Sequence, residues 1–193
     1  MMVSLSLFAR GSDAPSETKG KFSVERYNSL MQEYVANAIV LKKEPLRDLD
    51  GRYALFTERF GKVVGKTTSS RKITSKLAPH LEPGMVTRVR YVEKGGTQIV
   101  DALKVGRLSM KPHDLHGLAD VLAEGQPEYD LWTMLLGNDF SWPTALAMLG
   151  WDPRGAQCAT CGRTDIAAFY PYRQEFFCQS CASRLGRDAI SLS

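Results

Sequence analysis

Four cysteines stand in two pairs with the spacing of a metal site. Cys158 and Cys161 are separated by two residues, as are Cys178 and Cys181, and sixteen residues lie between the pairs. Two residues between ligands allow a tight turn to place both sulfurs on one edge of a tetrahedron, and thiolates favour zinc. Gly162 follows the first pair, where a left-handed turn is often needed. The pattern predicts one structural zinc ion per chain, in a closed shell that leaves no position for catalysis.

The segments around the cysteines must position them. The stretch AAFYPYRQEFF between the pairs predicts a β-hairpin that carries the second pair to the metal. Upstream, apolar residues at helical spacing predict three helices, near residues 115–122, 131–135 and 141–149. Ser141 is a good N-cap for the third helix, and Gly150 ends it. We expect these apolar faces to form core.

The middle of the chain has the pattern of a small β-barrel. Five strand-like segments, near residues 35–43, 52–58, 62–68, 85–93 and 97–108, are separated by turn-rich breaks, with a short helix-like piece between the third and fourth. This arrangement predicts a five-stranded OB-type barrel, with an SH3-like or other small barrel as the alternative. The predicted class is therefore α+β. We predict three parts. Residues 1–33 form a flexible extension with a short helix, whose apolar spacing runs on to Tyr34. Residues 34–111 form an OB-type nucleic-acid-binding domain, and residues 112–193 form a helical domain with its zinc module at 158–181.

The net charge of the chain changes sign at the same boundary between the predicted barrel and the helical domain. Residues 35–111 carry sixteen basic and seven acidic side chains, a net charge of +9, whereas residues 112–193 have a net charge of −5. A basic segment of this kind suggests a polyanionic partner, because Lys and Arg neutralise phosphates and release counterions. The basic residues predicted to bind nucleic acid are Lys66, Arg71, Lys72, Lys76, Arg88 and Arg90.

Aromatic residues beside these charges are candidates for stacking on bases. They are Tyr53, Phe56, Phe60 and Tyr91. In a barrel this small, we expect most of them to be core.

Other function classes are not favoured by the sequence. Neither a phosphate-binding Walker loop nor a G-x-S-x-G nucleophile elbow is present, so we expect no ATP use and no enzymatic activity. The first twelve residues lack the basic start of a secretory signal. We therefore expect a cytoplasmic, nucleoid-associated protein, a compartment in which paired cysteines favour metal over disulfides.

Two runs resemble the bacterial recombination-mediator family RecO. The run LGWDPRGAQCATCG, residues 149–162, resembles the segment that leads into that family's zinc site. The run from residue 37 to residue 84 resembles its N-terminal domain, with Leu-Phe-Thr-Glu at 55–58 and Phe-Gly-Lys at 60–62. The resemblance implies an OB-fold, a helical part and a zinc module. It also implies binding of single- and double-stranded DNA, strand annealing, and cooperation with RecR and single-strand-binding protein in loading RecA.

The residues alone leave two alternatives open. One is an RNA-binding protein of the translation machinery with an OB-fold and a zinc ribbon, since charge does not distinguish DNA from RNA. The other is a nuclease-type enzyme that uses the zinc ribbon only for docking. The predicted function is a non-catalytic DNA-binding and strand-annealing factor in recombinational DNA repair.

Overall fold

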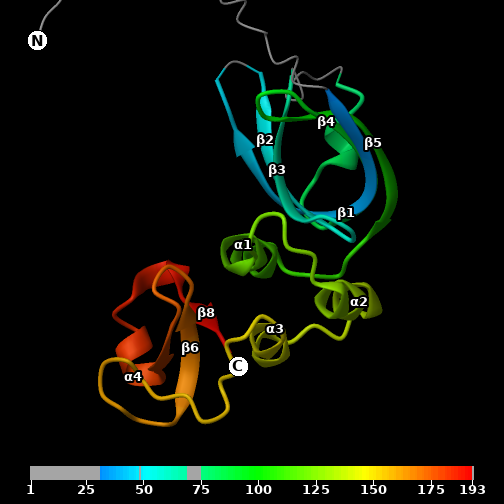
Figure 1. Ribbon diagram of the computed structural model, residues 1–193. Helices are drawn as coiled ribbons and strands as arrows, with labels where there is room; N and C mark the ends of the chain where they lie inside the picture. Colours follow the sequence, from blue (N-terminus) through cyan, green and yellow to red (C-terminus); the bar gives the residue numbers. More distant parts are fainter. Residues whose placement is uncertain (1–30, 48, 69–74, 193) are drawn as a thin grey trace, which may run out of the picture.

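The first part of the fold is a barrel of five strands. The computed structural model describes residues 31–47, 49–68 and 75–192 (Figure 1). The strands close in the order β1-β2-β3-β5-β4, with β1 pairing β4 to complete the ring. They are β1 (Gln32–Pro45), β2 (Gly51–Thr57), β3 (Gly61–Thr67), β4 (Met85–Glu93) and β5 (Thr97–Arg107), with the 3-10 turn η1 (Ala78–His80) before β4.

Every second side chain along the strands points into the barrel and fills its interior. On β2, Tyr53 and Leu55 point inward and are fully buried, and on β4 Val89 and Tyr91 do the same. This period of two leaves the intervening residues on the outer surface. The weakest seam joins β3 to β5, which pair at a single register position in the described residues.

Three short helices form a layer beneath the barrel (Figure 1). They are α1 (Pro112–Val121), α2 (Tyr129–Gly137) and α3 (Trp142–Met148). Ser141 caps α3, because its side chain accepts a hydrogen bond from the Thr144 N–H. The outer face of the barrel packs on this layer, so that Ile39, Leu41 and Phe56 share one hydrophobic cluster with the helices.

The chain after α1 crosses the barrel closely. The Gly125 N–H donates to the Lys62 carbonyl at 3.0 Å. Gly61 has φ +65°, and a Cβ there would lie 2.0 Å from the Gln126 carbonyl oxygen. Only glycine allows this approach, so Gly61 fixes how the barrel meets the helices.

A small three-stranded sheet ends the chain. The hairpin of β6 (Ile166–Tyr170) and β7 (Glu175–Cys178) is followed by α4 (Gln179–Ala182), the 3-10 turn η2 (Gly186–Asp188) and β8 (Ile190–Ser191). The strand order is β7-β6-β8. Phe169 and Ile190 reach from this sheet into the cluster shared by the helices and the barrel.

The predicted strands and helices are present, with two differences. Gln32 and Glu33 belong to β1 rather than to the predicted extension over residues 1–33 and its short helix, because their backbone pairs with β4. Residues 24–30 of that predicted helix lie outside the described residues. Between β3 and β4 the described part of the chain contains only the 3-10 turn η1 instead of an α-helix. None of the described helices has the length and apolar composition needed to span a membrane.

Candidate metal centre and nucleic-acid interface

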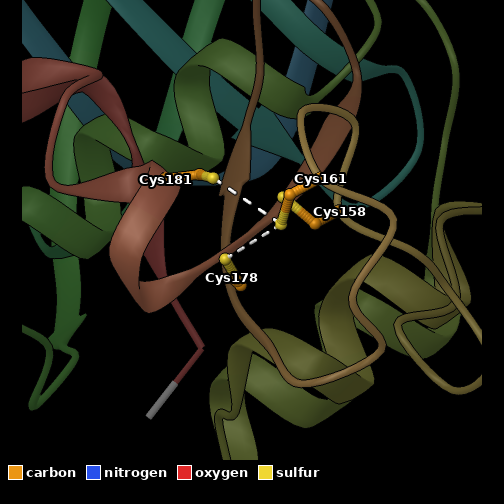
Figure 2. Close-up of side chains that lie close together, drawn as sticks. All are labelled: Cys158, Cys161, Cys178 and Cys181. Carbon is orange, nitrogen blue, oxygen red and sulfur yellow. Dashed lines mark hydrogen bonds between the residues drawn. The ribbon is translucent and has the colours of Figure 1, made fainter.

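The two cysteine pairs converge at one point. All four Sγ atoms lie within 4.8 Å of one another. Cys161 Sγ is 3.7 Å from Cys178 Sγ and 3.8 Å from Cys181 Sγ (Figure 2). Four sulfurs about 2.3 Å from a tetrahedral metal would be about 3.8 Å apart, whereas a disulfide needs about 2.0 Å. The geometry fits a four-thiolate metal site.

Local backbone structure brings the pairs together. Gly162 has φ +73°, as expected for a left-handed turn after the first pair, and its N–H donates to the Cys158 carbonyl at 2.9 Å. Cys178 ends β7, and Cys181 lies in the short helix α4 that follows. The Ala159 N–H donates to the Phe176 carbonyl at 2.9 Å, which ties the first turn to the hairpin.

The electrostatics of the cluster favour a bound cation. Backbone hydrogen bonds, chiefly that of Cys178, lower the pKa of Cys158 to about 6. The neighbouring Cys178 thiol, together with burial, raises the pKa of Cys181 to about 12. One thiolate therefore forms readily, but four adjacent thiolates need the positive charge of a metal ion.

The hairpin that carries the metal site has two different faces. Phe177 and Cys178 are buried on the cysteine side, with only 2% and 1% of their surface exposed. Phe176 faces the other way, and its ring lies 5.0 Å from that of Phe169. Phe169 in turn lies 5.4 Å from Trp151 and is fully buried in the main cluster. The cysteine cluster thus adjoins a sheet that completes the helical core.

The predicted nucleic-acid residues do not form one continuous track. Lys66 is exposed on the outer face of β3, and Arg88 and Arg90 are exposed on the outer face of β4. Strand β5 separates β3 from β4 in the barrel. Lys76 is exposed just before η1, and Arg71 and Lys72 lie outside the described residues.

The predicted nucleic-acid-binding residues differ in the charges that lie next to them. Arg90 forms an ion pair with Glu33 at 3.2 Å and stands opposite Asp101 in the strand register. Lys66 stands opposite Arg52 on β2, and Arg52 in turn stands opposite Glu44 on β1. Within the described residues, neither Lys66 nor Arg52 has an ion-pair partner. Lys66 and Arg52 are adjacent, exposed cations that one phosphate could contact together.

Arg52 is the residue that sequence reasoning missed. The signal was present, because Tyr53 and Leu55 are the inward residues of RYALFT and therefore leave Arg52 outside. Among the stacking candidates, Tyr53, Phe56 and Tyr91 are buried, as expected for core, and only Phe60 is partly exposed.

Comparison with known protein families identifies a family that the barrel resembles. Residues 31–107 match the family model for the N-terminal part of recombination protein O. This segment is similar to a RecO N-terminal domain. The resemblance to the RecO family, with its OB-type N-terminal domain, is thereby confirmed. The RecO match supports a role in recombination and repair in general. No match to a curated protein was found.

Proposed function

We propose that this protein is a non-catalytic DNA-binding and strand-annealing factor in recombinational repair. The RecO N-terminal domain carries the proposal, because the RecO family acts as a recombination mediator rather than as an enzyme. The exposed Arg52 and Lys66, adjacent on the barrel surface, would supply a phosphate contact that does not depend on sequence. Single- and double-stranded DNA are the proposed ligands, with RecR and single-strand-binding protein as partners.

We also propose that the four cysteines hold one zinc ion with a structural role. Residues Cys158, Cys161, Cys178 and Cys181 would be its ligands, since their sulfur separations suit a tetrahedral thiolate site. The zinc would fix the orientation of β6 and β7. With all four positions taken by sulfur, the site offers no place for a substrate.

Annealing of complementary strands tests the proposal. The protein should accelerate pairing of two complementary oligonucleotides, followed by the fluorescence of a donor and an acceptor on opposite strands. Adding ATP should change nothing, because the sequence contains no nucleotide-binding loop. A requirement for ATP, or tighter binding to RNA than to DNA of the same sequence, would contradict this function. Cleavage of either strand in the presence of magnesium would show a nuclease instead.

A further inference from the structure

A pocket opens in the barrel wall apart from the exposed basic residues. It has a volume of about 420 Å³ and lies where β3 and β5 separate, beyond their single paired position. Strands β1, β3, β4 and β5, the β2–β3 turn and the chain after α1 all contribute to it. Lys66, Arg88 and Arg90 do not line it. The pocket is therefore distinct from the surface that would contact phosphates.

Aromatic rings form one side of this pocket. The rings of Tyr34 and Tyr91 are stacked with centroids 5.2 Å apart, and Phe60 meets Tyr34 edge to face at the same distance. Tyr34 and Phe60 are only partly buried, so they keep ring surface available to a ligand. The Arg59 guanidinium lies 5.5 Å from the centroid of the Phe60 ring, at an exposed position. This combination offers a stacking surface with a cation beside it.

Tyr91 adds a polar group with no partner of its own. Only 2% of the residue is exposed, and within the described residues its hydroxyl makes no hydrogen bond. Burial raises the pKa of this phenol to about 12, so it remains a donor at neutral pH. The hydroxyl lines the pocket and can donate a hydrogen bond to a ligand or to water there.

Acidic groups complete the lining. Glu93 and Glu124 both line the pocket. The only other cation there, Lys62, donates to the Ala119 carbonyl at 2.9 Å, and burial lowers its pKa. The carboxylates therefore remain available as hydrogen-bond acceptors. Acceptors of this kind suit the amino group of cytosine, whereas thymine presents a carbonyl oxygen at the same position.

We propose that this pocket holds one unstacked, amino-bearing base of a single strand, cytosine in preference to thymine. The base lies against Tyr34 and Phe60, its amino group donates to Glu93 or Glu124, and Arg59 contacts the adjoining phosphate. The proposal rests on the proposed DNA-binding function. It adds a base preference, which the exposed cations do not supply because phosphate contacts carry no sequence information.

Binding of two homopolymers to the full chain tests the pocket. The affinity for a sixteen-residue oligo(dC) should exceed that for oligo(dT) by about fivefold at fixed salt. The double variant Glu93→Ala and Glu124→Ala removes both acceptors, so it should lose this preference while it still binds both strands. Phe60→Ala should weaken binding of both strands by about fivefold or more. The matched control Tyr172→Ala, at an exposed tyrosine of the metal module, should change neither affinity.

The possible results distinguish a failure of the pocket proposal from a failure of the proposed DNA-binding function. If the wild-type protein binds both homopolymers equally, or if the preference survives in the double alanine variant, the pocket does not hold a base and DNA binding stands. If the protein binds neither strand at low salt, both proposals are overturned. Thermal unfolding of each variant shows whether the fold is retained, and the alanine pair, at two exposed positions, keeps the test decisive if Phe60→Ala fails to fold.

Discussion

The barrel and the C-terminal part are stabilised in different ways. The barrel encloses its own hydrophobic cluster, in which Tyr53, Val89 and Tyr91 are buried among neighbouring strands. The small sheet at the C-terminus has instead a few apolar residues around its cysteines, and it gives Phe169 and Ile190 to a cluster shared with the helices. A domain too small for an adequate core needs a metal or disulfides. The barrel therefore has a core of its own, whereas the C-terminal sheet depends on the helices and on its cysteine cluster.

The largest expected effect is the loss of the metal. Cys178→Ser should reduce the zinc content from about one equivalent per chain to almost none, because Cys178 is one of four converging ligands. Metal binding contributes directly to folding free energy, so the segment 158–181 should unfold first. Elemental analysis and circular dichroism measure both effects. A metal-free wild-type protein with a native spectrum, or a Cys158–Cys161 disulfide in it, would refute the site.

The next effect tests the shared core. Phe56 is fully buried on the outer face of β2, with its ring 5.8 Å from that of Trp132 on α2. Phe56→Ala should lower the free energy of unfolding by about 3–5 kcal/mol, because the cavity would lie between barrel and helices. Chemical denaturation followed by tryptophan fluorescence measures this change. Tyr172→Ala, at a residue that is 68% exposed, is the control and should cost about 0.5 kcal/mol or less. A similar cost for both variants would show that barrel and helices do not depend on each other.

A smaller effect is expected at the start of α3. Ser141→Ala removes the side-chain acceptor of the Thr144 N–H and should cost about 1 kcal/mol. Ser141→Asp keeps an acceptor at this position and should retain most of the stability. Thermal unfolding of the two variants measures the difference in their stability. Equal melting temperatures of the two variants would show that the Ser141 side chain does not stabilise α3 by capping it.

Much of this architecture was readable from the sequence because the signals are local. Paired cysteines, the glycine after the first pair and the alternation of RYALFT each depend on neighbours in the chain. The shared core was harder to predict, although Ala38, Ile39, Val40 and Leu41 are consecutive buried residues, the mark of a strand covered on both faces. The predicted helical domain begins at residue 112, yet the main hydrophobic cluster extends across that boundary.

The candidate binding surface was less predictable because it depends on strand register. Only the pairing of β2 with β3 places Arg52 opposite Lys66, and only the pairing of β1 with β4 brings Glu33 to Arg90. The pocket beside Tyr34 and Phe60 likewise results from the separation of β3 and β5. Contacts between distant segments carry no local sequence signal.

Salt dependence of DNA binding tests the central claim, that the barrel surface rather than the metal module contacts the phosphates. The wild-type protein should show a slope of log affinity against log salt of roughly −3 to −4 on single strands, from about four to six phosphate contacts. Arg52→Ala with Lys66→Ala should flatten the slope by about 1.4. Arg173→Ala with Arg184→Ala, a metal-module variant with changes in and just after the predicted zinc module at 158–181, should leave it unchanged. An unchanged slope in the barrel variant, with a flattened slope in the metal-module variant, would contradict the account.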